Sequence, residues 1–148
     1  ELPKAIGCAA EYSDEILIEE FIPGRELTVG ILGNKSLPII EIKPDHDLFD
    51  YECKYTEGMS GYIVPAELSD SLARKISNDA LQIYSTIGCC HYARVDFRLN
   101  EKEEHFFLEV NTLPGMTSNS LLPKAAKAAG LKFSDLIETI INIATLRE

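Results

Sequence analysis

The chain has 148 residues, and its 24 acidic and 14 basic side chains give a formal net charge of −10. A chain of this length can bury one good core and is most simply one domain. The acidity argues against a nucleic-acid surface, and no apolar run reaches the ~20 residues of a membrane helix, so we expect neither partner. With no signal peptide and no CxxC pair among its four cysteines, the sequence favours a cytoplasmic protein with reduced thiols.

The first part of the chain predicts the tail of a helix over residues 2–11 and then three short strands. The strands are expected over residues 15–22, 26–32 and 37–42. A turn at Pro23 and Gly24 separates the first two, and a hairpin connection at residues 33–35 separates the second from the third. In the second strand Leu27, Val29 and Ile31 share one face, which we expect to be buried.

A segment without periodicity follows over residues 44–61, and a loop of this length in a compact domain is typically functional or disordered. A short strand over residues 62–64 is closed by Pro65, and a clear helix follows over residues 69–87. Its expected buried stripe is Leu72, Ile76, Ala80, Ile83 and Ile87.

Two more helices are expected after a hairpin over residues 91–112, at residues 121–129 and 134–147. The last helix should turn one apolar stripe inward, made of Leu136, Ile137, Ile140, Ile141 and Ala144. The sum of these elements is an α+β fold, an antiparallel sheet with helices packed on one face.

The hairpin is the most informative part of the sequence. With its turn at residues 100–104, alternation gives an apolar face and a polar face. The expected apolar pairs are Val95 with Val110, Phe97 with Leu108 and Leu99 with Phe106. On the polar face Asp96 lies opposite Glu109, and Arg94 lies opposite Asn111. A slip of one residue would misplace the apolar face, so the register is well specified.

Opposed carboxylates repel each other, and a divalent cation would resolve the conflict. Two carboxylates and an amide oxygen are hard ligands suited to Mg²⁺ or Mn²⁺. The alternative is a solvated polar face with Arg94 as its counter-charge. The loop over residues 112–117 favours a functional site, because its backbone N–H groups and hydroxyls could receive an anion.

Two further segments have a structural and a functional interpretation. Glu19, Glu20, Phe21 and Ile22 form either an edge strand with exposed acids or a purine pocket. In the pocket, backbone groups would bond the base edge, and Glu26 would accept hydrogen bonds from ribose hydroxyls. Lys54 either is solvated or reaches a transferring phosphate from a lid that excludes water.

Taken together, several stretches resemble the D-alanine–D-alanine ligases of the ATP-grasp superfamily. They read EEFIPGRELTVGILG, DYECKYT, ARVDFRLN and FLEVNTLPGMTSNSLLPKAAKAAG, and the resemblance covers essentially the whole chain in order. It implies an ATP-dependent enzyme that joins two D-alanines through an acyl phosphate for peptidoglycan. The sequence departs from the usual pattern at His91 and Asn119, neither of which is an expected ligand.

The resemblance also implies roles for individual residues. Two magnesium (or manganese) ions would be held by Asp96, Glu109 and Asn111, with Glu109 bridging both. Arg94 and the Gly115 amide would stabilise the oxyanion, Lys54 would contact the γ-phosphate, and Tyr55 would be the lid tyrosine of dipeptide-forming members. Ser120 and Leu121 would hold the carboxylate of the second substrate, and Glu19, Glu20, Phe21, Ile22 and Glu26 would contact adenine and ribose.

Such ligases are about twice this long, so we expect residues 1–148 to form one ATP-grasp catalytic subdomain without the N-terminal domain and the other lobe. That lobe would supply part of the ATP site, so the chain alone should have little or no ligase activity. A homodimer is an open alternative for the full-length enzyme. Two other functions stay open, namely a nucleotide-binding or assembly module without catalysis, and a ligase for another second substrate such as D-lactate.

Overall fold

The computed structural model describes residues 1–44, 60–117 and 119–145, so the predictions made for Lys54 and Tyr55 lie outside it. Its helices are α1 (Leu2–Ala10), α3 (Asp70–Thr86), α4 (Leu121–Ala128) and α5 (Phe133–Thr145). Its strands are β1 (Arg25–Leu32), β2 (Lys35–Ser36), β3 (Ile40–Pro44), β4 (Ser60–Ile63), β5 (Tyr92–Leu99) and β6 (His105–Asn111). None of the helices in these ranges has the length and apolar character needed to cross a membrane.

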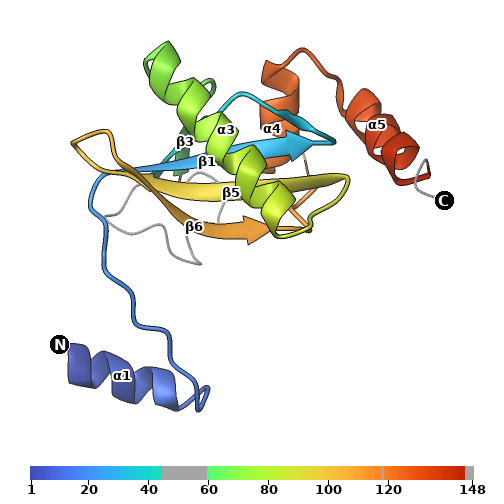
Figure 1. Cartoon of the computed structure of the whole chain (residues 1–148). Coiled ribbons are helices and arrows are strands. Elements are labelled where there is room, and N and C mark those ends of the chain that lie inside the picture. The colour runs from blue at the N-terminus through green and yellow to red at the C-terminus, as the bar shows by residue number, and fades with distance from the viewer. Residues whose placement is uncertain (45–59, 118, 146–148) are drawn as a thin grey trace.

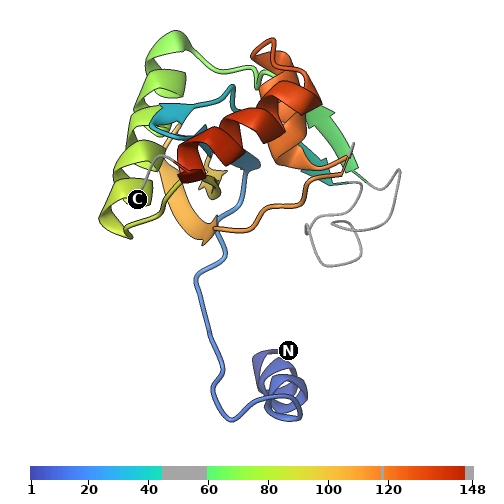
Figure 2. The same ribbon diagram turned by 90° about the vertical axis from the view of Figure 1, so that its right-hand side faces the viewer.

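The strands form one antiparallel sheet in the order β4-β3-β1-β5-β6, with the short β2 paired to β1 (Figure 1). This confirms the α+β class. Helix α3 packs on the face that carries Leu27, Val29 and Ile31, as expected. Helix α4 packs on the opposite face, where a Cβ added to Gly30 would lie 2.8 Å from Leu122 Cδ1. The helices therefore cover both faces and not one, and Figure 2 shows α3 and α4 on opposite sides of the strands.

Helix α3 begins as the sequence predicts, because the Ser69 hydroxyl oxygen accepts a hydrogen bond of 3.3 Å from the Leu72 amide. Leu72, Ile76 and Ala80 are buried, but the stripe continues to Tyr84. The predicted place of Ile87 in this stripe is wrong, since its side chain is 56 % exposed. Ile87 is the C-cap residue that follows the last helical turn, so it lies outside the helix that carries the stripe.

Helix α5 also buries a narrower stripe than predicted. Leu136 is fully buried, and Ile140 and Ile143 pack against the same cluster of apolar residues as α4. Ile141 and Ala144 are exposed, contrary to the prediction. Leu136, Ile140 and Ile143 are spaced so that their side chains lie in one narrow row along the helix. Such a row is typical of a helix that packs against another helix.

The strand predicted over residues 15–22 does not form, and the chain there is extended and mostly exposed. Leu17 and Ile18 are 80 % and 60 % exposed. A strand requires a neighbour for its backbone N–H and C=O groups, and this segment runs away from the sheet toward α1 (Figure 1). The predicted third strand is also shorter, since residues 37–39 leave the ladder between β2 and β3.

The β5–β6 hairpin confirms the register at its polar end. Arg94 lies opposite Asn111, Val95 opposite Val110 and Asp96 opposite Glu109. In the turn over residues 100–104, the Asn100 amide donates a hydrogen bond of 3.0 Å to the Glu104 carbonyl.

A register shift after Asp96 makes the remaining predicted pairs wrong. Phe97 pairs with Phe107 instead of Leu108, and Leu99 pairs with His105 instead of Phe106. The ring of Phe107 then meets that of Phe97 edge to face at 6.3 Å. Phe106 and Leu108, expected in the core, are 37 % and 42 % exposed.

The close approach of Gly24 to β5 gives a stability prediction. Gly24 has φ +129°, and an added Cβ would collide with the Leu99 carbonyl oxygen. We expect Gly24→Ala to lower the free energy of unfolding by about 2 kcal/mol, because backbone strain and overlap add together. Urea unfolding followed by circular dichroism would measure the loss.

Gly88→Ala is the matched control. Gly88 also has a positive φ, +77°, but its added Cβ would have no neighbour within 4 Å. It should therefore cost only the conformational strain of about 1 kcal/mol. Equal losses in the two variants would contradict the steric account of Gly24.

Candidate functional site

The candidate site lies on the sheet face opposite α3, where β1, β5 and β6 run side by side. Paired residues of an antiparallel ladder point to the same face, so the ladder brings separate sequence segments together. The pairs on this face are Glu26 with Arg98, Thr28 with Asp96, Gly30 with Arg94, Asp96 with Glu109, and Arg94 with Asn111. The residues that the hairpin pattern predicted as ligands therefore do share one face.

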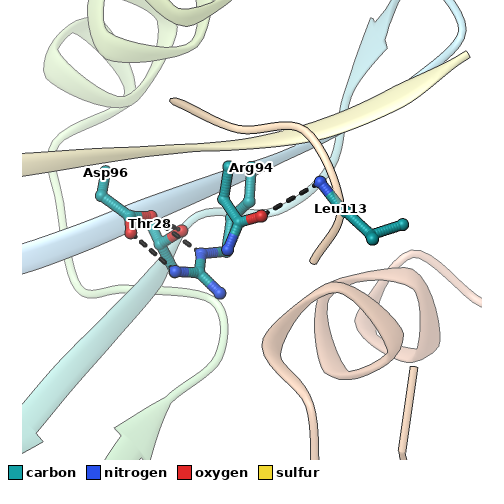
Figure 3. A network of polar contacts seen from close by, with 5 residues as sticks. Thr28, Arg94, Asp96 and Leu113 are labelled. Carbon is teal, nitrogen blue, oxygen red and sulfur yellow. Dashed lines mark hydrogen bonds and ion pairs between the residues drawn. The ribbon is translucent and has the colours of Figure 1, made fainter. Parts of the chain in front are cut away.

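Asp96 is the buried centre of this face, and it is only 3 % exposed. Arg94 donates from Nε to Asp96 Oδ1 at 2.9 Å and from Nη2 to Oδ2 at 2.7 Å. The Thr28 hydroxyl donates to Oδ1 at 2.5 Å from the neighbouring strand. Figure 3 shows these contacts, in which the guanidinium and the hydroxyl both face the carboxylate. A buried carboxylate needs such partners to remain ionised.

The negative charge of this face affects the pKa of Arg94. Burial disfavours the charge of this side chain, but a hydrogen bond to Asp96 and nearby carboxylates outweigh that effect and raise the arginine pKa above its ordinary value. The carboxylates are those of Asp96, Glu109 and Glu26. One arginine therefore lies among three carboxylates, and their remaining negative charge favours the binding of a cation at this face.

The oxygen donors available to a metal ion are the carboxylates of Asp96 and Glu109 and the amide of Asn111. The Asn111 Oδ1 accepts a hydrogen bond of 3.1 Å from the Leu113 amide, which orients the side chain at the end of β6. Within the described ranges no group of three or more His, Cys, Asp or Glu side chains could hold a metal, so the set depends on the amide oxygen. These hard donors fit Mg²⁺ or Mn²⁺ in type.

The loop between β6 and α4 brings together two more predicted site residues. A Cβ added to Gly115 would lie 2.8 Å from the Ser120 hydroxyl oxygen. That oxygen accepts a hydrogen bond of 3.0 Å from the Thr117 amide, and it lies 2.9 Å from the Thr117 hydroxyl. Ser120 is the N-cap residue of α4, and Leu121 begins the helix with its side chain buried.

The segment expected to receive a purine lies beside Arg98. The guanidinium donates to the Ile22 carbonyl at 3.0 Å and to the Gly24 carbonyl at 2.9 Å, and it lies 3.4 Å from the Glu26 carboxylate. Phe21 has its ring 5.6 Å from the guanidinium carbon. Glu19 and Glu20 are exposed in the extended chain that precedes them.

Sequence reasoning missed Thr28 and Arg98. Both lie on the polar face by simple alternation, because Thr28 falls between the buried Leu27 and Val29, and Arg98 follows Asp96 by two residues. The missing information was that β1 pairs with β5, a contact between residues about seventy positions apart that no local pattern contains.

Comparisons with known proteins identify the family to which the chain is similar. A family model described as "D-ala D-ala ligase C-terminus" matches residues 1–142. A curated D-alanine–D-alanine ligase from Syntrophotalea carbinolica is 44 % identical over 148 residues, which is 100 % of this chain and 48 % of the relative. This chain therefore spans about half the length of such relatives.

Solved structures give the same result. The D-alanine–D-alanine ligase from Bacillus anthracis complexed with ATP has a TM-score of 0.83 at 38 % identity, over 97 % of this chain and 47 % of that one. The VanG D-Ala:D-Ser ligase from Enterococcus faecalis has a TM-score of 0.81 at 34 % identity, over 96 % of this chain and 42 % of that one. With the family model matching nearly all of the sequence, the chain belongs to the D-alanine–D-alanine ligase family, in the part of it described as the C-terminus.

Proposed function

We propose that the native gene product containing this chain joins two D-alanines at the expense of ATP, through an acyl phosphate, to give D-alanyl-D-alanine for peptidoglycan in the cytoplasm. In this proposal residues 1–148 are its Mg-ATP-binding catalytic lobe. The observation that carries the proposal is the shared face of Asp96, Glu109, Arg94 and Asn111 in a chain of this ligase family. The similar ligase from Bacillus anthracis was solved in complex with ATP, which supports ATP as the co-substrate.

Asp96, Glu109 and Asn111 are the residues that would hold two divalent ions, with Glu109 bridging them. Bound there, the ions would neutralise the negative charge that develops on the transferring phosphoryl group. Arg94 and Thr28 hold the Asp96 side chain in place, since their hydrogen bonds reach both carboxylate oxygens. The acidic face that raises the Arg94 pKa gives the electrostatic reason for binding cations.

Arg94 and the backbone N–H of Gly115 are the proposed oxyanion donors when the amine of the second substrate attacks the acyl phosphate. Donors fixed before the reaction need no reorganisation as charge develops, and one such donor typically contributes about 3–4 kcal/mol. The side chain of Arg94 is 12 % exposed and doubly hydrogen-bonded, so it is fixed in this sense. Ser120 and Leu121 would hold the carboxylate of the second substrate at the start of α4, where helix amides favour an anion.

Adenine and ribose are assigned to Glu19, Glu20, Phe21, Ile22 and Glu26. The chain over residues 19–22 supports this assignment, since Glu19, Glu20 and Phe21 are exposed and the backbone groups of this stretch are not used in a sheet ladder. Lys54 as a γ-phosphate contact and Tyr55 as the lid tyrosine remain part of the proposal on the family resemblance. A homodimer of the whole enzyme is a further part of the proposal.

A second candidate changes the second substrate and keeps the chemistry. The similarity to the VanG D-Ala:D-Ser ligase favours including D-serine beside D-lactate as an alternative to the second D-alanine. Tyr55 favours D-alanine over D-lactate. A nucleotide-binding module without catalysis is the remaining alternative for the chain alone.

The function is tested by incubating the native gene product with ATP, Mg²⁺ and D-alanine and measuring phosphate release and dipeptide by mass spectrometry. We expect D-alanyl-D-alanine to be the main product when D-alanine competes with equal D-lactate or D-serine. A depsipeptide or a D-Ala-D-Ser product would support the second candidate. ATP binding without any ligation product would support the module. The 148-residue chain assayed alone should show little or no turnover.

The metal role predicts the behaviour of Glu109→Gln in the native gene product. The substitution keeps the size of the side chain and one acceptor oxygen but removes the charge, so turnover should fall by more than about a hundredfold with the fold unchanged by circular dichroism. Glu101→Gln, an exposed residue in the turn of the same hairpin, is the control and should keep full activity. Retention of more than about a tenth of the activity by Glu109→Gln would contradict the metal role.

The contact between Gly115 and Ser120 predicts the effect of Gly115→Ala. The added Cβ would press on the Ser120 hydroxyl and displace the proposed carboxylate-binding turn, so the KM for the second D-alanine should rise by about tenfold or more. Steady-state kinetics with varied D-alanine would measure this.

Ser120→Ala gives the discriminating background. Without the hydroxyl, the atom nearest to the added Cβ is Ser120 Cβ at 3.6 Å, an ordinary contact. Gly115→Ala should then cost little beyond Ser120→Ala alone. The same additional loss in both backgrounds would argue against the contact and for a direct effect on the Gly115 amide.

A further inference from the structure

Arg98 joins the sheet to the extended segment that precedes it. Its side chain is only 13 % exposed although it carries a full charge. Arg98 Nε and Nη2 donate to the carbonyls of Ile22 and Gly24, at 3.0 and 2.9 Å, and Nη1 lies 3.4 Å from Glu26 Oε2. The ring of Phe21 lies over the same guanidinium, 5.6 Å from its centre. One side chain on β5 therefore contacts four positions on another segment.

These contacts use what is particular to arginine. A planar guanidinium presents several N–H donors in fixed directions and can also stack on an aromatic ring. A lysine could satisfy one or two of these partners but not all of them at once. The segment it holds has no sheet ladder over residues 15–24, so its conformation depends on contacts of this kind.

We propose that Arg98 is the positioning residue for the nucleotide, holding Phe21 and the Ile22–Gly24 backbone for the base and Glu26 for the ribose. This rests on the proposed function, in which these residues contact adenine and ribose. Arg98 itself acts through them. It restrains the carbonyl groups of Ile22 and Gly24, the residues on either side of Pro23, and it fixes the direction of the Glu26 carboxylate, which must accept from the ribose hydroxyls.

This role has a consequence that general destabilisation lacks. If Arg98 orients Glu26, its loss should weaken recognition of the ribose hydroxyls more than recognition of the triphosphate. The ratio of affinities for ATP and 2′-deoxy-ATP then reports the orientation of Glu26, while the affinity for ATP reports the whole segment. A variant that merely loosens the fold would change both affinities by the same factor.

The test measures binding of Mg-ATP and Mg-2′-deoxy-ATP to the native gene product by calorimetry, with Arg98→Met and Arg98→Lys. Arg98→Met should weaken ATP binding by about tenfold, as expected for losing hydrogen bonds to a charged group, and should bring the ATP to deoxy-ATP ratio close to one. Arg98→Lys keeps the charge and the buried stem, so it should fold and show an intermediate ratio. With saturating ATP, kcat should change by less than about twofold, because Arg98 touches none of the proposed reacting groups.

Arg25→Met is the matched control. Like Arg98, Arg25 pairs with a glutamate and donates to a backbone carbonyl, but its partners are Glu41, at 3.1 and 2.7 Å, and the Glu67 carbonyl on the other side of the sheet. It should leave both nucleotide affinities unchanged.

An unchanged ratio of ATP to deoxy-ATP affinity in Arg98→Met would overturn the positioning role. If Arg98→Met does not fold, the same result in Arg98→Lys would overturn it. In either case, ATP binding by the unmodified protein leaves the proposed function standing. An equal change in Arg25→Met would also overturn it. If the unmodified protein binds neither nucleotide, the proposed function itself fails and this inference fails with it.

Discussion

The burial of the Asp96 carboxylate is the constraint on which the rest of the site depends. A carboxylate that is 3 % exposed is costly unless its oxygens are satisfied, and Arg94 and Thr28 supply three hydrogen bonds. Thr28 can do so only if β1 lies directly beside β5 in the observed register. The pairing of β6 with β5 places Glu109 and Asn111 across from Asp96 and Arg94, so residues of three strands meet around this one buried carboxylate.

The shift after Asp96 explains how one hairpin serves both a site and a core. Up to Asp96 the ladder keeps the polar residues in register, with Glu109 and Asn111 on the site face. Beyond it the shift turns the half-exposed Phe107 toward Phe97, which belongs to the core beneath α3. A regular ladder would instead have continued with Leu108 opposite Phe97. The irregularity therefore lies directly beside the candidate ligands, where bulges are common in functional sheets.

Local patterns predicted much of this, and the exceptions have physical reasons. The ligand pairs, the Ser69 cap and the helix α3 follow from alternation, capping and periodicity, which depend on neighbouring residues. Residues 15–22 would form a strand only beside a partner strand, and the apolar side chains of this segment carry no information about whether such a partner is present. The shift after Asp96 and the roles of Thr28 and Arg98 depend on β1 lying beside β5, which is a property of the assembled sheet.

The opposite face of β1 shows why the proposed substrate loop lies close to the acidic cluster. This face has an apolar part, where Ile40 and Ile42 pack under α4, and a polar part on β5 and β6. Gly30 lies opposite Arg94, between the two parts, and it has Leu122 of α4 directly above it. Because a side chain at this position would meet Leu122, glycine lets the first turn of α4 approach the sheet beside Arg94. Since α4 begins directly after Ser120, this close packing brings the end of the loop to the edge of the polar part, where a phosphate and a carboxylate could be held together.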